Sequence, residues 1–382
     1  MIRIALNELG GENWTGGITY RNNLIMALKL CNEEFKLYQI SRNSPVDMPE
    51  YKIIDFKNSS NWLEKKYDAF SRHYLKQDYL MAKTLNRDSI DVLFPGTMSA
   101  GKRTAPIFWI PDFQFMHLPQ LYSDQQLKQF DIKLNRYFND VPIIVVSSKD
   151  AQSDFKKFSP QFLHKTRVLN FVAHVPEDLY DINPKDIADI YHLPQEFIYM
   201  PNQFWAHKNH TMVFEALKIL KDQGIKPNIV CTGNPVDVRK PMHFAGLLQK
   251  ISELGIHEQV IFLGLIPHKH LYSLIRQSKC VLNPSHFEGW STTVEETKSV
   301  GKSMILSDLG VHQEQSPESS LYFDRYSAKD LADKIKEVWK NLSVGPDTVL
   351  ENKARNALQQ RMKKFAKTFL TICKEARDTI KN

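Results

Sequence analysis

The feature that most constrains the fold is an alternation of short apolar runs with longer segments of helical spacing. It recurs over nearly the whole chain of 382 residues. The runs are rich in β-branched and aromatic residues, as in Ile2–Leu6 and Ile143–Val146, whereas the apolar residues of Ile18–Leu30 share one helical face. Short apolar strands that alternate with amphipathic helices indicate parallel sheets with helices on both faces. We therefore predict an α/β fold.

The alternation falls into two series, which predicts two doubly wound domains. The first series occupies residues 1–172, and the second begins near Phe197. The stretch between them, residues 173–195, is largely polar and contains prolines, so we predict a linker there. We assign the second domain to residues 196–359. Apolar residues in the tail recur every three or four positions over Glu351–Ile380, which predicts a helix whose last part, about residues 360–382, returns to the first domain.

Composition restricts the partners and the compartment. The chain has 42% apolar and 24% charged residues and a net charge of +7, which is typical of a globular protein with a basic surface. Anionic membrane lipid, an anionic substrate and scattered solvated lysines all remain open as explanations of that charge. Nucleic acid is disfavoured because no recognisable binding module accompanies the charge. Without a signal peptide or a long apolar stretch, we expect a cytoplasmic protein, either free or peripheral at the inner face of the membrane.

The densest chemical signal lies between residues 283 and 308. A predicted strand ends at Pro284-Ser285, a turn with Glu288-Gly289 follows, and a helix carrying Glu296 comes next. The first backbone N–H groups of a helix are free and bind anions, so we expect a phosphate group there. Glu288 and Glu296 are expected to face one crevice above the strand ends, although a glutamate early in a helix often only complements the helix dipole. The predicted N–H donors are Ser291, Thr292, Thr293 and Val294.

This segment resembles the signature of family 4 glycosyltransferases. The shared features are the Glu-Gly turn, a second glutamate eight positions after the first, a glycine after the helix at Gly301, and a strand that ends in Ser307-Asp308. Three preceding segments also resemble that family, namely Tyr199–His210, Cys231–Pro235 and Val260–Leu274. Tyr199–His210 is especially similar to its bacterial polysaccharide-biosynthesis branch. The resemblance implies the GT-B architecture, in which two Rossmann-like domains face each other across a cleft and the C-terminal domain holds a nucleotide-sugar donor.

The resemblance also implies roles for single residues. Lys208 would neutralise the donor diphosphate, Glu288 would hold the transferred sugar, and Glu296 would bind the ribose. An ordinary solvated lysine is the alternative for Lys208. Many relatives carry an arginine five positions before this lysine, where this chain has the uncharged Gln203. The remaining predicted donor-site residues are Gly16 and Gly17 in the loop after the first strand, Gly233, Leu265 and Ile266.

A second segment, Trp109–Pro119, is expected to line the reaction centre. Many relatives have a histidine just before the aspartate at this place, whereas this chain has Pro111 followed by Asp112. Either Asp112 or His117 would then make the contact at the reaction centre, although a histidine in an aromatic-rich segment is often structural. Ser147, which follows the next strand, is a weaker acceptor-site candidate.

The chain lacks a recognisable metal-binding motif. No Asp-x-Asp sequence stands in a convincing metal-binding loop, and the four cysteines lack zinc-ligand spacing. We expect Lys208 and the helix N-terminus to supply the positive potential that Mg²⁺ supplies elsewhere, so the predicted enzyme needs neither metal nor cofactor. The predicted activity is retaining transfer of a sugar from a nucleotide-diphosphate-sugar to a hydroxyl of a glycan or polyprenyl-linked acceptor, in cell-surface polysaccharide biosynthesis of the O-antigen or capsule kind.

Two other functions stay open. A nucleotide-sugar epimerase or a phosphorylase would share the two-domain plan, and a catalytically degenerate nucleotide-sugar-binding subunit would account for Gln203 and Pro111. The basic and aromatic stretch Asn61–Arg87 is a candidate surface for anionic lipid, with a core-facing helix pair as the alternative.

Overall fold

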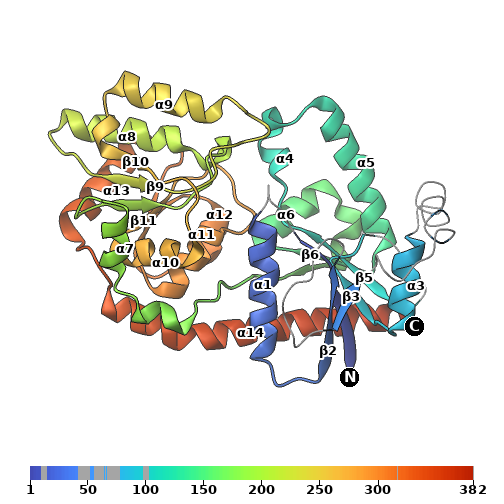
Figure 1. Ribbon diagram of the computed structural model, residues 1–382. Coiled ribbons are helices and arrows are strands. Elements are labelled where there is room, and N and C mark those ends of the chain that lie inside the picture. Colours follow the sequence, from blue (N-terminus) through green and yellow to red (C-terminus); the bar gives the residue numbers. More distant parts are fainter. Residues whose placement is uncertain are drawn as a thin grey trace. The chain divides into compact units, whose positions relative to one another are not determined.

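The computed structural model describes residues 1–9, 15–41, 52–55, 64, 66, 78–97, 103–315 and 317–381. The chain forms two compact units (Figure 1). Unit 1 comprises Met1–Phe113, Asp124–Phe171 and Met362–Asn382, and unit 2 comprises Gln114–Ser123 and Val172–Arg361. Each unit contains its own parallel sheet.

The sheet of unit 1 has the strand order β3-β2-β1-β4-β5-β6-β7. Because the order reverses at β1, the sheet is doubly wound. Its strands are β1 (Ile2–Leu6), β2 (Phe35–Ser41), β3 (Lys52–Asp55), β4 (Val92–Phe94), β5 (Ala105–Ile110), β6 (Ile143–Val146) and β7 (Thr166–Val168). The helices between them are α1 (Thr15–Lys29), α3 (Tyr79–Arg87), α5 (Asp124–Asp140), α6 (Lys149–Phe158) and the 3-10 helix η3 (Pro160–Lys165).

The sheet of unit 2 has the order β10-β9-β8-β11-β12-β13 and reverses at β8. Its strands are β8 (Ile198–Met200), β9 (Ile229–Cys231), β10 (Val260–Phe262), β11 (Val281–Asn283), β12 (Met304–Ser307) and β13 (Ser320–Phe323). Its α-helices are α4 (Gln114–His117), α7 (Pro184–Ile190), α8 (His210–Asp222), α9 (His243–Leu254), α10 (His268–Gln277), α11 (Thr292–Val300), α12 (Gly310–Gln315) and α13 (Ala328–Asn341). Its 3-10 helices are η2 (Pro119–Leu121), η4 (Glu177–Asp181), η5 (Ala206–Lys208) and η6 (His257–Gln259).

These two sheets confirm the predicted α/β class with two doubly wound domains. Strands β6 and β12 are buried at every position, as expected for parallel strands that helices cover on both faces. In unit 2 the two faces pack separate apolar clusters. One cluster joins Leu217 of α8 to Leu331 of α13, and the other joins Ile275 of α10 to Val294 of α11. In the described residues no helix has the length and apolarity needed to cross a membrane.

The predicted linker, residues 173–195, is instead a folded part of unit 2. It contains η4 and α7, and its apolar residues Val175, Leu179 and Ile187 lie in the core of that unit. The prolines misled the prediction because Pro184 stands at the first position of α7, where a missing N–H costs no hydrogen bond.

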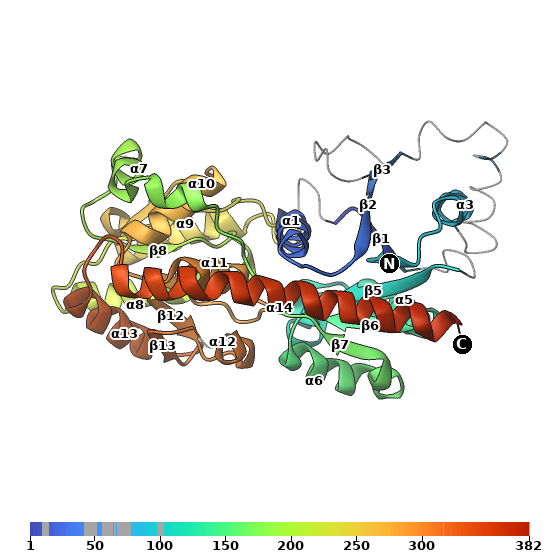
Figure 2. The ribbon, with the colours of Figure 1, turned by 90° about the horizontal axis from the view of Figure 1, so that it is seen from below.

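Two chain segments lie in a unit other than the one that sequence position indicates. Residues 114–123, inside the range predicted for the first domain, belong to unit 2. The tail helix α14 (Thr348–Lys381) begins in unit 2 and ends in unit 1, and it covers the predicted helical segment Glu351–Ile380 (Figure 2). Buried Met362, Phe365 and Phe369 fix its second half in unit 1, so the predicted return of the tail is confirmed.

Candidate functional site

The candidate site lies where the loops after β8 and β11 meet in unit 2. The two strands are parallel neighbours, with Tyr199 opposite Val281, so both loops leave the same edge of the sheet. The backbone N–H of His286 donates to the carbonyl of His207 at 2.8 Å, which joins the loops directly. The side-chain amide of Asn209 donates to the carbonyl of Pro284 at 3.1 Å and adds a second connection.

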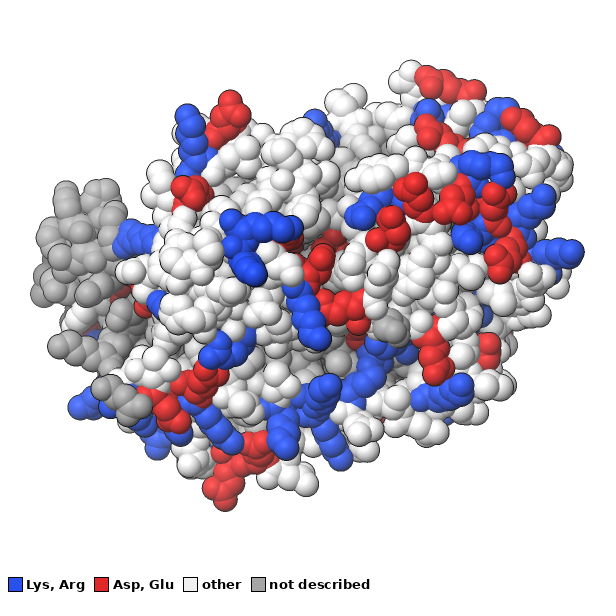
Figure 3. Space-filling view, turned by 180° about the vertical axis from the view of Figure 1, so that it is seen from behind, with Lys and Arg blue, Asp and Glu red and all other residues white. Residues whose placement is uncertain are grey.

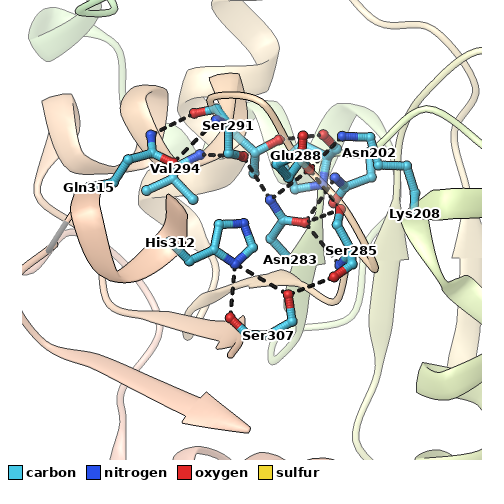
Figure 4. Close-up of polar contacts among 12 residues, drawn as sticks. Asn202, Lys208, Asn283, Ser285, Glu288, Ser291, Val294, Ser307, His312 and Gln315 are labelled. Atoms are coloured by element: carbon cyan, nitrogen blue, oxygen red, sulfur yellow. Dashed lines mark hydrogen bonds and ion pairs between the residues drawn. The ribbon is translucent and has the colours of Figure 1, made fainter. Parts of the chain in front are cut away.

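Lys208 and Glu288 form an ion pair at this junction. Nζ of Lys208 donates to Oε1 of Glu288 at 2.6 Å, and the side chains are only 12% and 9% exposed (Figure 4). The hydroxyl of Ser285 donates to the same Oε1 at 2.7 Å. Lys208 ends η5, and the left-handed conformation of Asn209, with φ of 55°, turns the chain into α8. The structure therefore brings together two of the predicted catalytic side chains.

A hydrogen-bonded network connects this ion pair to the start of α11. Nδ2 of Asn283 donates to the hydroxyl of Ser291 at 2.8 Å, and that hydroxyl caps the helix by accepting from the N–H of Val294 at 3.4 Å. Gln315 clamps the same residue from α12, because its Oε1 accepts from the N–H of Ser291 at 3.2 Å and its Nε2 donates to the Ser291 carbonyl at 2.9 Å. The network fixes the position of the helix N-terminus relative to Glu288.

The titratable groups leave one cation and one anion at the junction. Burial raises the pKa of Glu288, but the charge and hydrogen bond of Lys208, together with smaller contributions from His207 and His312, outweigh it and bring that pKa to about 2, so the carboxylate is ionised. Burial lowers the pKa of His207 and His210 to about 3 and of His312 to about 4, so these imidazoles are neutral at pH 7. Lys208 and Glu288 therefore form the ionised pair here, and a second pair, Arg325 with Asp308, lies nearby, since Arg325 donates to the His286 carbonyl at 3.5 Å.

Two of the four predicted backbone donors are already used within the protein. The N–H of Ser291 bonds to Gln315 and that of Val294 bonds to the Ser291 hydroxyl. Within the described part of the chain, the N–H groups of Thr292 and Thr293 donate to no protein acceptor. The Thr293 hydroxyl donates to the Pro201 carbonyl at 3.1 Å, so this end of α11 lies against the loop after β8. The expectation of four free donors is thereby corrected to two.

Glu296 is hydrogen-bonded to His268, whereas Glu288 is paired with Lys208. Glu296 lies in the second turn of α11 rather than the first, and its Oε1 contacts Nε2 of His268 at 2.8 Å. Burial lowers the pKa of His268, but the hydrogen bond to Glu296 and the negative charge of that carboxylate together outweigh burial, so the pKa is raised. His268 begins α10, just after the predicted base-binding residues Leu265, which is exposed, and Ile266, which packs against the core.

The loops after β8, β9 and β10 are joined through their backbones. Oε1 of Gln203 accepts from the N–H of Asn234 at 2.6 Å. Gly233 has φ of +152°, its N–H donates to the Gly264 carbonyl at 2.9 Å, and a Cβ at this position would lie 2.4 Å from the carbonyl oxygen of Asn202. Only glycine allows this close approach of two loops. The side-chain oxygen of Gln203 therefore joins two loops, whereas its amide Nε2 has no acceptor among the described residues.

The remaining predicted residues lie elsewhere. Gly16 and Gly17 are in the first turn of α1 rather than in a loop, because the helix already begins at Thr15. Asp112 follows β5, and buried Ser147 follows β6, where its hydroxyl accepts from Nε1 of Trp109 at 3.4 Å. All four belong to unit 1, so their contribution to a site in unit 2 stays a prediction.

His117 belongs to unit 2 and lies beside the candidate site. Its ring centroid is 5.0 Å from that of Phe287, the neighbour of Glu288 in sequence. Arg239 holds the surrounding segment in place: its guanidinium donates to Oε1 of Gln114 and, at 3.5 Å, to the hydroxyl of Tyr122. Of the two candidates for the reaction-centre contact, His117 is therefore the one placed within unit 2.

Several functional candidates were missed by sequence reasoning. They are Asn283, Ser285, His207, His268, His312 and Gln315. The first two stand within the recognised motif, and the need of a buried glutamate for donors could have identified them. Gln315 and His312 lie on α12 and carry no local signal. In the described residues no group of three or more His, Cys, Asp or Glu side chains is placed to hold a metal ion.

Comparisons with known proteins agree with this geometry. Residues 186–365, which contain the strands and loops of the site, match the family model of glycosyl transferases group 1. No curated protein sequence matches the chain.

Solved structures share the fold at low sequence identity. HepE from Anabaena, solved with UDP and glucose, has a TM-score of 0.67 and 15% identity over 100% of both chains. Sucrose-phosphate synthase from Thermosynechococcus elongatus has a TM-score of 0.66 and 15% identity over 100% of this chain and 98% of its own. A glycosyltransferase from Rickettsia africae has a TM-score of 0.65 and 16% identity over 99% and 98%. These matches show the two-domain α/β fold known as GT-B.

Proposed function

We propose that this chain, which has the GT-B fold and matches the glycosyl transferases group 1 over residues 186–365, is a glycosyltransferase that moves a sugar, with retention of configuration, from a nucleotide-diphosphate-sugar to a hydroxyl of a glycan or lipid-linked acceptor. The observation that carries the proposal is the buried Lys208–Glu288 pair at 2.6 Å, next to the network that caps α11. HepE has been solved with UDP-glucose and a trehalose-6-phosphate synthase with UDP-2-fluoro glucose, so uridine diphosphate sugars are the first donors to test.

In the proposed mechanism the donor diphosphate binds between Lys208 and the start of α11. The ammonium group has three protons, of which Glu288 accepts one, so two remain for phosphate oxygens. The unpaired N–H groups of Thr292 and Thr293 add two further donors. These groups are already oriented in the protein, so they stabilise the negative charge that grows on the β-phosphate as the bond to the sugar breaks.

The acceptor reacts without a covalent enzyme intermediate. Its hydroxyl oxygen attacks the anomeric carbon from the face that the diphosphate leaves, and its proton passes to the departing phosphate oxygen. One carbon–oxygen bond breaks and one forms, with no change of oxidation state. Asp112 and His117 remain the candidates that orient the sugar and the acceptor, with Ser147 as a weaker one.

The rest of the donor is assigned to the neighbouring loops. Glu296, whose orientation is fixed by His268, binds the ribose hydroxyls, because a carboxylate accepts strong hydrogen bonds from them. The loops at Gly233 and at Leu265-Ile266 enclose the base, and the amide nitrogen of Gln203 donates to the diphosphate. The motif spacing around Glu288 supports assignment to family 4, with the donor in unit 2, the acceptor in unit 1 and Gly16-Gly17 beside the phosphate.

The wider setting follows from the same resemblance. We propose a metal-independent enzyme of cell-surface polysaccharide biosynthesis that works at the inner face of the membrane on a lipid-linked saccharide. Lys208 takes the place of a metal ion as the positive charge at the diphosphate.

A donor panel tests the function. UDP-, GDP- and dTDP-sugars are compared by thermal shift, and a bound donor at a hundredfold excess over its dissociation constant adds about 2.7 kcal/mol of stability. The selected donor is then incubated with and without lipid-linked saccharide fractions, and nucleoside diphosphate release and product anomers are followed by NMR. Acceptor-dependent release with retention, unchanged in EDTA, supports the proposal.

Other outcomes contradict parts of it. Isomerisation of the sugar without an acceptor indicates an epimerase, and phosphate-dependent cleavage indicates a phosphorylase. Donor binding without turnover on any acceptor fraction indicates a binding subunit. Activity that EDTA abolishes and Mg²⁺ restores excludes the metal-independent mechanism, and an inverted anomer excludes retention.

A further inference from the structure

The positive charge of the protein is concentrated on helix α14. The helix carries nine Lys and Arg and three Asp and Glu side chains, a net charge of +6, whereas the whole chain has +7. Between Asn352 and Lys374 it contains no acidic residue. The excess lysines are therefore not scattered over the surface, which was one of the open explanations of the basic composition.

Three of these lysines point away from the protein. Lys363, Lys364 and Lys367 are exposed, while Phe365 and Phe369 on the opposite face are buried. The ring of Phe369 packs at 5.1 Å from that of Phe94, and the ring of Phe365 lies 6.2 Å from that of Tyr20. The aromatic contacts fix the helix in unit 1, so its ammonium groups are presented to solvent from a rigid element.

The exposed lysines keep their charge available. Other cations of α14 have carboxylate partners, as in Arg361 with Glu295 and Lys374 with Glu33. None of the ion pairs among the described residues involves Lys363, Lys364 or Lys367. In the space-filling view, Lys and Arg side chains gather along the lower edge, where α14 runs in Figure 1 (Figure 3).

Helix α13 provides the comparison within the same chain. It carries four lysines and three acidic residues, a net charge of +1, and its exposed Lys329 pairs with Asp333 at 2.6 Å. Mixed charges of this kind are usual for a solvated helix face. The one-sided charge of α14 differs from this pattern and requires an anionic partner or a purely solubilising role.

We propose that the face formed by Lys363, Lys364 and Lys367 docks the enzyme on an anionic membrane surface, which rests on the proposed use of a lipid-linked acceptor. Lipid headgroups are bound by ammonium groups alone, at about 1 kcal/mol for each lysine near the surface. None of the solvent-exposed residues of α14 is aromatic, so the helix lacks the side chains on which single-stranded nucleic acid stacks. Binding of this kind is weak, reversible and sensitive to salt.

Vesicle sedimentation of the full chain tests the proposal. The probes are vesicles of phosphatidylcholine alone and of equal parts phosphatidylcholine and phosphatidylglycerol, at low and high salt. The wild type binds only the anionic vesicles and only at low salt. The variant K363Q/K364Q/K367Q binds them about a hundredfold more weakly, as expected for three lysines of about 1 kcal/mol each. The variant K363R/K364R/K367R, which keeps the charge, binds as the wild type does.

A matched control removes three exposed lysines from α13. The variant K329Q/K336Q/K340Q loses the same charge and retains vesicle binding. If both glutamine variants bind anionic vesicles equally weakly, binding depends on net charge alone and the proposal is overturned. The proposal is also overturned if the wild type does not bind anionic vesicles at low salt, or if it binds soluble heparin but no vesicle. Donor binding by thermal shift stays unchanged in all variants, so failure of the docking surface is distinguishable from failure of the proposed function.

Discussion

The two units have parallel sheets of the same class, but the side chains that pack near their central strands differ in kind. In unit 2, polar side chains around Asn283 and Glu288 bond to one another at the ends of β11 and β8. In unit 1, Tyr20 stacks on Trp109 at 4.5 Å, and the rings of Phe94, Phe171 and Phe365 surround it. One unit therefore holds a charged, hydrogen-bonded site and the other an aromatic core.

This difference indicates which unit is more sensitive to substitution of its residues. A hydrogen-bonded network tolerates few substitutions, because each buried polar atom needs its partner. An aromatic core tolerates changes that conserve volume. In unit 1 the Tyr20 hydroxyl has no hydrogen-bond partner in the described structure, and burial raises its pKa, so the side chain acts as an apolar ring. We therefore expect substitutions in the polar network of unit 2 to be much more destabilising than substitutions in the aromatic core of unit 1.

The largest effect is expected at the ion pair. Lys208→Ala leaves an ionised Glu288 buried without its partner, which lowers the free energy of unfolding by about 3–5 kcal/mol. Turnover falls by at least about a hundredfold, because the charge at the diphosphate is lost. The double variant K208M/E288L replaces the pair by apolar side chains and recovers most of the stability, but it stays inactive. Denaturant unfolding and nucleoside diphosphate release measure the two quantities, and an active single variant contradicts the assignment.

Acid is expected to unfold unit 2 before unit 1. Buried His207, His210 and His312 have folded pKa values of about 3 to 4 against an ordinary 6.5, so unfolding takes up protons as the pH falls below 6.5. Each histidine then removes about 1.4 kcal/mol of stability per pH unit until its folded pKa is reached. Glu288, with a folded pKa of about 2 against 4.5, adds a loss as the pH falls from about 4.5 to about 2.

Hydrogen exchange after brief acid incubation checks this order. Peptides of unit 2 lose protection at a higher pH than those of unit 1, whose described histidine, His164, is exposed. His210→Phe, which keeps a ring stacked on Phe204, reduces the proton uptake by about one and makes the unfolding free energy less steep in pH. Equal acid sensitivity of both units would remove the histidines as the cause.

A smaller difference in stability is expected between two variants that each lose one hydroxyl group. Ser285→Ala removes a donor to Glu288 and is expected to cost about 1–3 kcal/mol, because the buried carboxylate loses a hydrogen bond. Tyr20→Phe removes a hydroxyl that bonds to nothing described and is expected to be neutral or stabilising by up to about 1 kcal/mol. Denaturant unfolding at pH 7 measures both. A Tyr20→Phe variant as unstable as Ser285→Ala would refute the contrast between the units.

Local chemistry explains what could be predicted from the sequence. The periodicity of apolar residues predicted both sheets, since strand and helix spacing are properties of short segments. Glu288 and Ser291 lie close together in one strand–turn–helix motif, so their proximity was predictable. Lys208 comes from the loop after another strand, and it was placed by resemblance rather than by periodicity.

The missed features depend on tertiary contacts. Gln315 reaches Ser291 from α12, and nothing near Gln315 in the sequence indicates that partner. The prediction of a linker failed because Pro184 starts a helix as readily as it interrupts one. The basic stretch Asn61–Arg87, for which a lipid surface and a core-facing helix pair were both open, falls largely outside the described residues. The exposed lysine face of α14 became apparent only from the structure.

The assignment of residues 114–123 to unit 2 has a practical consequence for engineering. The chain passes between the units four times, at Phe113, Ser123, Phe171 and Arg361. A hybrid enzyme built by a single exchange at residue 172 would separate Gln114 and Tyr122 from Arg239, the side chain that holds them. Unit 2 is therefore transplanted intact only when residues 114–123 are exchanged together with residues 172–361.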